Sequence, residues 1–490
     1  MNSRRSVGWS WLVAVLGIVA PSVAQESVEL TLGDRPQLFV DHHFIESIEG
    51  DARLKLWEPR ASESVLTFDK PWEGRYCGYA TVLHDDDRYR LYYRGLPEAG
   101  KDGSDTETTC YAESTDGIHW TKPDLGIHEI DGSTENNVVL MGQAPFSHNF
   151  SPFIDTRPGV PASERYKAMA GTLESKLVPF VSPDGLHWSK ITEEPAITKG
   201  AFDSQNIAFW SESEQLYLCY FRVWSEGDFR GYRSIARATS TDFIHWTEPI
   251  EMTYSDTPRE HLYTNQTQPY FRDPSLYVAI AARFMPGRRV VDPAQFEALG
   301  GQASYSGDCS DTVLMTSRGG TQYARTFMEG FVRPGIGLNN WSSRTNYPAL
   351  GLVPTGPEEM SFYIQRNYGQ TTHYLQRMTL RTDGFVSVHG AYTGGVLHTK
   401  PFVLDRNELV LNFSTSAAGT VRVELRTLDG ERIPGFTRGK CDEILGDQIE
   451  RVVTWGGESD LSALTGKTLR MSVYLNDADL FSVRCRNRKG

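Results

Sequence analysis

The sequence predicts an all-β protein, made of a five-bladed β-propeller followed by a C-terminal β-sandwich of jelly-roll type. Three observations support this prediction: the motif Ser-x-Asp-Gly-x-His-Trp recurs along the chain, short strand-like stretches separate its copies, and no long helical periodicity interrupts them. The chain has 490 residues, which is more than one ordinary domain but suits a repeat architecture with a second, smaller unit.

The recurring motif sets the expected number of blades. Three copies are clear, at 114–120, 182–188 and 240–246. A degenerate fourth copy lies at 317–323 and a fainter fifth at 382–385. The third positions of the five copies are 116, 184, 242, 319 and 383, so the spacings are 68, 58, 77 and 64 residues. Repeats of this length, each with four short strands, predict five blades.

The residue types of the motif suit a structural role. Each clear copy follows a strand-like stretch, and the Asp-Gly pair of the first two copies, which is Asp-Phe in the third, favours the positive φ of a tight turn. The Ser and Asp side chains can accept hydrogen bonds from backbone N–H groups of that turn, and the Trp can pack between blades. We therefore expect the Asp and His residues of the motif to be structural and not catalytic.

The rest of the chain follows the rhythm of short strands. In the first repeat, strands are expected at 79–84 and 88–94, and the matching second strands of the other repeats at 165–171, 215–222, 276–283 and 359–366. After about Thr399 the pattern changes, with strands expected at 402–413, 420–427, 448–455 and 468–475. The predicted organisation is a signal peptide at 1–24, the propeller at 25–398 and the sandwich at 399–490.

The N-terminal segment is typical of an exported protein. Arg4 and Arg5 precede an apolar stretch at 7–20, and Ser22 to Ala24 form a small-residue cleavage site. The apolar stretch is too short to span a bilayer, and no later segment is long enough. The protein is expected to be secreted or periplasmic after cleavage near Ala24, without a membrane span.

Cysteine usage and charge limit the partners. Cys77 with Cys110, and Cys441 with Cys485, are possible disulfide pairs, although free buried thiols are an equal alternative. No Cys/His cluster indicates zinc. The formal charge is 49 − 62 = −13, which excludes a nucleic-acid footprint and favours neutral ligands.

The motif, the blade count and the terminal unit together make the chain resemble the five-bladed propeller glycosidases of glycoside hydrolase families 32 and 43. Within these, it resembles a branch of secreted bacterial proteins that are uncharacterised. The resemblance rests on strings such as Ser-Thr-Asp-Gly-Ile-His-Trp at 114–120 and covers residues 41 to about 395. It implies a carbohydrate substrate. The Asn-Asp-Pro-Asn signature of family 32 does not occur, and Arg272-Asp273-Pro274 matches its Arg-Asp-Pro. However, this tripeptide joins a first strand to a second strand, which places it on the rim opposite the pocket.

Topology predicts which loops surround the central pocket: those that enter the inner strands, and those between the second and third strands of each blade. From these loops we expect Glu73 to be the base or nucleophile, Asp203 its counterpart, and Glu174 the acid or a modulator. Each has a structural alternative. Glu73 could face solvent in its turn, Asp203 could cap a turn, and Glu174 could be an ordinary loop charge.

The same loops supply amides, arginines and aromatic rings, the residue types that bond sugar hydroxyls and stack on sugar rings. The expected substrate-binding residues are Trp72, Tyr76, His148, Asn149, Gln205, Asn206, Arg222, Trp224, His261, Tyr263, Asn265, Arg344, Asn346, Arg366 and Tyr368. No cofactor is required. A structural ion such as calcium in the channel, near His148, His261 or His373, is an alternative to ordinary hydrogen bonding by these histidines.

These observations predict a secreted glycoside hydrolase that acts on an extracellular poly- or oligosaccharide through carboxylate acid/base chemistry. The alternative is a non-catalytic propeller that binds carbohydrate or serves as a surface scaffold, because the family-32 signature is missing. A sialidase-like enzyme is a third option, for which Arg222, Arg344 and Arg366 would have to gather at one face.

Overall fold

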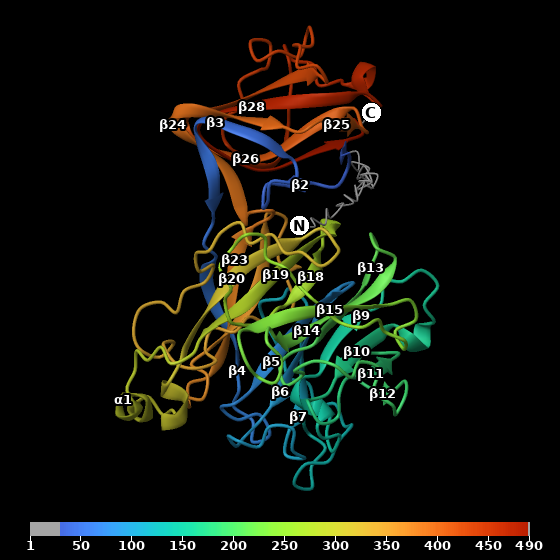
Figure 1. The fold of residues 1–490 in the computed structure, drawn as a ribbon, viewed down its shortest axis with the longest axis vertical. Helices are drawn as coiled ribbons and strands as arrows, with labels where there is room; N and C mark the ends of the chain where they lie inside the picture. The colour runs from blue at the N-terminus through green and yellow to red at the C-terminus, as the bar shows by residue number, and fades with distance from the viewer. Residues whose placement is uncertain (1–29, 489–490) are drawn as a thin grey trace, which may run out of the picture.

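The computed structural model describes residues 30–488, so the predicted signal peptide lies outside the described residues. Two bodies are visible in Figure 1: a propeller and, above it, a smaller β module that contains the C-terminal strands. The prediction of a nearly all-β chain is confirmed.

The first three blades are four-stranded antiparallel sheets whose strands follow chain order from the axis outward. Blade 1 consists of β5 (Gly78–Asp85), β6 (Arg88–Gly95), β7 (Thr108–Ser114) and β8 (Val138–Leu140). Blade 2 consists of β9 (Ser151–Ile154), β10 (Tyr166–Ala170), β11 (Val178–Ser182) and β12 (Ser189–Lys190). Blade 3 consists of β13 (Ile207–Ser211), β14 (Leu216–Trp224), β15 (Arg233–Ser240) and β16 (Ile250–Glu251).

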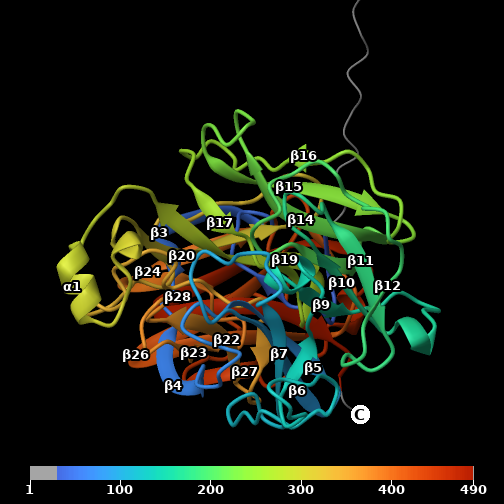
Figure 2. The same cartoon turned by 90° about the horizontal axis from the view of Figure 1, so that it is seen from below.

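The last two blades depart from this simple order. In blade 4 the inner strand is split into β17 (Leu262–Thr264) and β18 (Thr267–Tyr270), both paired with β19 (Asp273–Met285), and β20 (Cys309–Ser317) follows. Blade 5 contains β21 (Val353–Pro354), β22 (Glu359–Arg366) and β23 (Tyr374–Arg381), and its outer strand is β4 (Arg60–Thr67) from before blade 1. This pairing closes the ring. The strand pairings give five four-stranded sheets, which confirms the predicted blade count. Figure 2 shows their strands spread around the axis.

The three clear motif copies form identical turns, as predicted. In the first copy, Asp116 Oδ1 accepts the backbone N–H groups of Ile118 and His119 at 2.8 Å, and Ser114 Oγ accepts that of Gly117 at 3.0 Å. The Trp120 indole closes the turn on the Gly117 carbonyl at 3.1 Å. Burial would raise the pKa of Asp116, but its hydrogen bonds, led by His119, lower it well below the usual range. The motif aspartates are therefore turn-forming groups.

The motif also joins neighbouring blades. Tyr92 of blade 1 donates to the Gly185 carbonyl of the blade 2 motif at 3.0 Å, and Tyr363 of blade 5 donates to the Gly117 carbonyl at 2.5 Å. At Gly185 φ is +78°, and an added Cβ would lie 2.6 Å from the Tyr92 hydroxyl, so the blade contact requires glycine. The turn itself also accepts Phe243, which has φ +69° at the same position of the third copy. Trp188 packs edge-on against Phe150.

The smaller module is an eight-stranded sheet with its own hydrophobic core. Its strands are β1 (Leu30–Leu32), β2 (Gln37–Leu38), β3 (Ile45–Leu56), β24 (Val386–Thr399), β25 (Phe402–Leu404), β26 (Glu408–Thr427), β27 (Asp447–Val452) and β28 (Thr468–Arg486). The expected boundaries placed residues 25–398 in the propeller and only 399–490 in the second unit. The strand pairings instead place β1, β2, β3 and β24 in the module. β1 to β3 and β24 pair with the C-terminal strands, because the chain passes through this module before it enters the propeller. The pairings give one continuous sheet, and a separation into two packed sheets remains an expectation.

The two bodies contact each other through a buried hub at Asp383. This carboxylate, fully buried, accepts hydrogen bonds from the hydroxyls of Tyr270 and Ser482, both at 2.6 Å, and forms an ion pair with Arg272 at 2.5 Å. Arg272 also lies 3.4 Å from Glu450 of the module. The Arg-Asp-Pro tripeptide is thus at the contact between the bodies, on the rim expected from topology.

Helices are few and short. The α-helix α1 (Pro293–Ala298) lies in the β19–β20 connection, and its N-cap Asp292 forms a capping box with Gln295. Short 3₁₀ turns occur at Phe146–His148, Ala162–Glu164, Ala303–Ser306 and Ser462–Leu464. Within residues 30–488 no helix is long and apolar enough to cross a membrane. All six cysteines are buried free thiols.

Candidate functional site

A small pocket of about 50 Å³ is lined by residues of blades 1, 3, 4 and 5. Its lining residues are Gly78, Tyr79, Arg94, Asp102, Asp203, Tyr263, Arg344, Tyr347, Gln365 and Tyr368. They come from the loops that topology predicts and from the strand ends next to these loops: Gly78 and Tyr79 lie in β5, Arg94 in β6, Tyr263 in β17 and Gln365 in β22. The pocket combines carboxylates, guanidinium groups and phenol rings.

Asp203 and Arg222 form the central ion pair of the site. Asp203 precedes β13, and its side chain is 47% exposed, whereas Arg222 near the end of β14 is only 4% exposed. The Arg222 guanidinium also lies over the Tyr263 ring, 4.8 Å from its centroid. A partly accessible carboxylate, held by a buried cation, is therefore presented to the pocket.

Arg94 organises the blade 1 side of the pocket. Its guanidinium donates to the Tyr76 carbonyl at 2.9 Å and lies 3.2 Å from His148 Nδ1 and 3.9 Å from Glu107 Oε1. It also stacks on the Tyr79 ring at 4.7 Å. These contacts are almost completely shielded from solvent, so Arg94 is held in one orientation.

Among the described residues, one group of side chains has a spacing suitable for a metal ion. The ligand atoms of Asp102, Glu107 and His148 lie within 4.8 Å of one another. However, His148 Nδ1 and Glu107 Oε1 are already hydrogen-bonded at 2.8 Å, and the Arg94 cation adjoins both. A second cation there would be repelled, and we assign no metal to the site. His373 instead packs on the Phe68 ring at 4.5 Å, and His261 packs on Tyr232.

Tyr263 experiences the positive charge of the pocket directly. Burial alone would raise its pKa, but the charges of Arg344 and Arg222 outweigh burial and lower the pKa of Tyr263 to about 7. By contrast, burial keeps the pKa of the neighbouring Tyr79 well above its usual value. The pocket therefore stabilises one negative charge at Tyr263.

Two residues that line the pocket have an unusual backbone conformation. Tyr79 has φ +49° and Arg344 has φ +59°, in the left-handed region that residues other than glycine rarely adopt. Such conformations cost free energy and are concentrated at functional sites, where the surrounding structure fixes a side chain in place. Here they position a ring and a cation at the pocket wall.

Glu73 does not reach the pocket. Its side chain is fully buried; Oε1 accepts the Tyr93 hydroxyl at 2.5 Å, Oε2 accepts the Lys70 N–H at 2.8 Å, and Lys122 Nζ lies 2.8 Å from the carboxylate. With both oxygens bonded to neighbouring groups, the carboxylate has a structural role. This differs from both the expected catalytic role and the solvent-facing alternative.

Glu174 is also outside the pocket. It is exposed in the connection between β10 and β11 and is not among the lining residues. Blade 2 contributes no lining residue, and of the three expected catalytic carboxylates only Asp203 lies at the pocket.

The expected substrate-binding residues fall into three groups. Tyr263, Arg344 and Tyr368 line the pocket. Arg222, His148 and Tyr76 lie behind that wall, bonded to or packed on lining residues. The others make structural contacts: Trp72 with Asn137, Asn149 with Phe202, Gln205 with Gln266, Asn206 with Phe202, Asn265 with Tyr220, Asn346 with Arg366, and Trp224 and His261 beside Arg233. The third group does not line the pocket; in it, Asn149, Asn206 and Asn265 at the strand entries donate to backbone carbonyls instead.

Asp102 lies in the connection between the second and third strands of blade 1, which topology places at the pocket, but sequence reasoning missed other lining residues: Gly78, Tyr79, Arg94, Tyr347 and Gln365. A signal for Arg94 was present. The expected second strands of blades 1, 3, 4 and 5 end at Arg94, Arg222, Arg283 and Arg366, so an arginine recurs at one position of the blade. In two of these blades the arginine reaches the pocket or its immediate wall.

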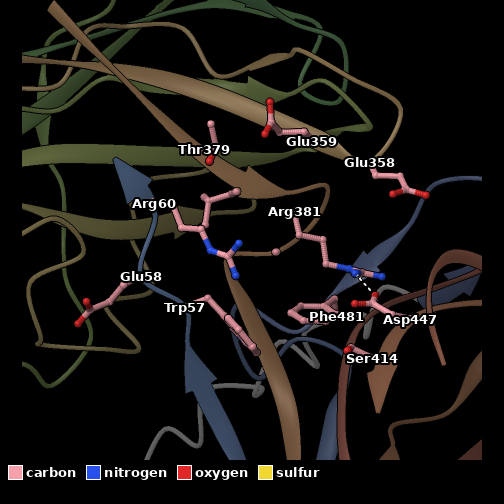
Figure 3. Close-up of a pocket in the computed structure, with 12 residues that line it drawn as sticks. Trp57, Glu58, Arg60, Glu358, Glu359, Thr379, Arg381, Ser414, Asp447 and Phe481 are labelled. Carbon is pink, nitrogen blue, oxygen red and sulfur yellow. Dashed lines mark hydrogen bonds and ion pairs between the residues drawn. The ribbon is translucent and has the colours of Figure 1, made fainter. Parts of the chain in front are cut away.

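A second, wider cleft of about 410 Å³ lies between blade 5 and the module (Figure 3). Trp57 and Phe481 lie at its wall with ring centroids 5.4 Å apart, and Arg381 and Asp447 are bonded across it. This cleft is at the contact between the two bodies, away from the propeller axis, and its charged groups stabilise that contact.

The chain matches no protein-family model and no curated protein. Solved structures similar to it include an N-acetylgalactosamine deacetylase from F. plautii, with 14% identity and TM-score 0.42, covering 69% of this chain and 95% of that one. A glycoside hydrolase has 10% identity and TM-score 0.43 (66% and 92% covered), and a thermostable family-43 glycoside hydrolase has 11% and 0.38 (64% and 92%). At these values the chemistry of the site has to be interpreted from its own residues.

Proposed function

We propose that the protein is a glycoside hydrolase whose active site is the pocket at Asp203. The observation that carries this proposal is the convergence, at one pocket, of two partly or fully exposed carboxylates, Asp102 and Asp203, with tyrosine rings and hydrogen-bonding side chains. Glycosidic cleavage uses two carboxyl groups, one as acid and one as base or nucleophile.

The two carboxylates have different surroundings. Asp203 is paired with Arg222 and is suited to the ionised role of base or nucleophile. Asp102, in the exposed connection after β6, adjoins the buried pair of Glu107 and His148, and in this proposal it protonates the leaving group. Glycosidases divide the two roles in the same way, by environment.

The other lining residues can hold the sugar. Tyr79 and Tyr368 offer ring faces, and the Gln365 amide and Arg344 guanidinium offer hydrogen-bond donors to hydroxyl groups. The cavity of about 50 Å³ is smaller than typical ligand pockets of about 300 to 1,000 Å³, so at most the end of a glycan chain enters it. In this proposal the substrate is an extracellular oligo- or polysaccharide cleaved from one end, by a protein that acts outside the cytoplasm.

The test is hydrolysis of a broad panel of aryl glycosides and polysaccharides by the mature protein, Asp203→Asn and Asp102→Asn, with Glu174→Gln as a matched control. The proposal expects activity in the protein and the control, and its loss in both pocket variants. Activity that survives both changes would contradict the assignment.

The alternative is a propeller that binds carbohydrate without cleaving it. It is favoured by the finding that Glu73 and Glu174 lie outside the pocket, which leaves Asp102 as the only exposed carboxylate partner for Asp203 among the lining residues. Glycan binding with no turnover on the whole panel would decide for this alternative.

A further inference from the structure

Arginines gather at the pocket, although the protein as a whole is acidic. The chain has a formal charge of −13, from which neutral ligands were expected. Yet Arg94 and Arg344 line the pocket and Arg222 forms the wall behind it. Local potential in a cleft depends on the charges that line it and not on the net charge, so the ligand has to be inferred from this cluster.

Carboxylates accompany some of these arginines: Asp102 and Asp203 line the same pocket, and Glu107 lies behind it. Arg222 is paired with Asp203, and Arg94 lies 3.9 Å from Glu107. Arg344 has no carboxylate within ion-pair distance in residues 30–488, and its guanidinium lies instead 5.0 Å from the ring centroid of Tyr305. A half-buried guanidinium that has the Tyr263 phenol beside it but no carboxylate partner is a preferred partner for an anionic ligand.

The buried arginine behind the wall has unused donors. Arg222 is 4% exposed, and its Nε and Nη1 have no hydrogen-bond partner among the described residues. Buried donors of this kind are normally satisfied, and unsatisfied ones at a pocket indicate a missing partner. Arg222 is at the same time bonded to Asp203, so a ligand that reaches it would also contact the proposed catalytic carboxylate.

Tyr263 gives independent support, because it lies between these cations. The Arg222 guanidinium is 4.8 Å from its ring centroid and the Arg233 guanidinium 5.5 Å. Arg344 and Arg222 together overcome the effect of burial and lower the pKa of Tyr263 to about 7. A site that favours a phenolate in its wall favours other oxyanions at the same place.

The geometry points to a substrate whose terminal sugar carries an acidic substituent, a carboxylate or a sulfate ester, bound by Arg344 with help from Arg222. This inference rests on the proposed function, since it names the substrate class of the same pocket. Planar guanidinium groups bind such oxyanions through paired hydrogen bonds, which lysine does not reproduce.

Calorimetric titration of the mature protein tests this inference. The probes are glucuronate and galacturonate for the carboxylate source, a sulfated galactose for the sulfate source, and glucose and galactose as neutral sugars. We expect at least one acidic sugar to bind about tenfold or more tightly than its neutral counterpart, as charge-assisted bonds allow. Arg344→Gln is expected to remove that preference, and Arg344→Lys to restore it only in part.

The matched control is Arg75→Gln, an exposed arginine at the rim that donates to the Gly300 carbonyl at 3.0 Å and does not line the pocket. It should leave the preference unchanged. A readout without mutation is the phenolate absorbance of Tyr263: a bound acidic sugar should raise the pKa of Tyr263, and a neutral sugar should not.

Equal affinities for acidic and neutral sugars, a preference that survives Arg344→Gln, or no binding by any probe would overturn the inference. The two proposals fail in different experiments. Cleavage of neutral glycosides without a preference for acidic sugars would contradict the acidic substrate but support the hydrolase activity. Arg344-dependent binding of acidic sugars without cleavage of any glycoside would support the acidic ligand but contradict the hydrolase activity.

Discussion

The carboxylate of Asp203 and the guanidinium of Arg222, 19 residues apart in the chain, form an ion pair at the wall of the central pocket. Asp203 comes from the loop that enters the inner strand of blade 3, and Arg222 from the second strand of the same blade. The pair therefore depends on one blade only, while the pocket around it is built from three others.

The first prediction concerns Asp203→Asn. Because this change keeps the shape of the side chain and removes its charge and basicity, hydrolysis should fall by about 10²- to 10⁴-fold, as for loss of a general acid or base. Steady-state kinetics on the best panel substrate measure the effect. Glu174→Gln removes an exposed carboxylate from the same face and should keep wild-type rates; equal losses in both variants would contradict the role of Asp203.

The second prediction assigns Glu73 to stability. Replacing it with Gln leaves Lys122, which is 12% exposed, with only Asp69 as its carboxylate partner, at 3.0 Å. Breaking a buried pair by removal of one partner costs about 3 to 5 kcal/mol, and the remaining Asp69 contact should keep the loss near the lower value. Urea unfolding measures it.

The catalytic parameters of Glu73→Gln should match those of the wild type at a temperature where the variant is folded. Glu174→Gln, at an exposed position, should leave the free energy of unfolding unchanged. A stable but inactive Glu73→Gln would return Glu73 to the list of catalytic candidates.

The sequence predicted the blades well because the motif turn is local: Ser114, Asp116 and Gly117 bond to one another within four positions. It also found Asp203, Tyr263, Arg344 and Tyr368, since topology brings the inner-strand entries to one face. It could not place Glu73, whose partner Lys122 is 49 residues away and is brought close only by tertiary packing.

The domain boundaries show a similar limit. Strand composition indicated a change near Thr399, but nothing local reveals that β3 pairs with β24, more than 300 residues later. Strands from the two ends of the chain meet because the propeller ring is closed. The outer strand of blade 5, β4, likewise comes from the N-terminal side of the chain.

The third prediction follows from the hub at Asp383. Asp383→Ala should leave Arg272 without its closest carboxylate and the Tyr270 and Ser482 hydroxyls without their acceptor, all in a buried contact. We expect a clear loss of thermal stability, and earlier proteolysis at the junction of the two bodies. Asp429→Ala, in an exposed turn of the module, serves as the control. A melting temperature equal to that of the control would show that the hub does not hold the bodies together.

The last prediction is the titration of Tyr263. A single tyrosine should ionise near pH 7, visible as phenolate absorbance, and Tyr263→Phe should abolish this transition. The sign of the linked stability follows: between pH 7 and pH 10 the unfolded chain, with the ordinary tyrosine pKa of 10.0, binds one proton more than the native protein. This group therefore makes the native protein more stable as pH rises through that range, by about 1.4 kcal/mol per unit, and its contribution is lost as pH falls through 7.

Unfolding free energies measured across this range should rise more steeply for the wild type than for Tyr263→Phe. Parallel pH profiles for the two proteins would mean that Arg344 and Arg222 do not stabilise an anion in the pocket, which would also remove the support that Tyr263 gives to an acidic substrate.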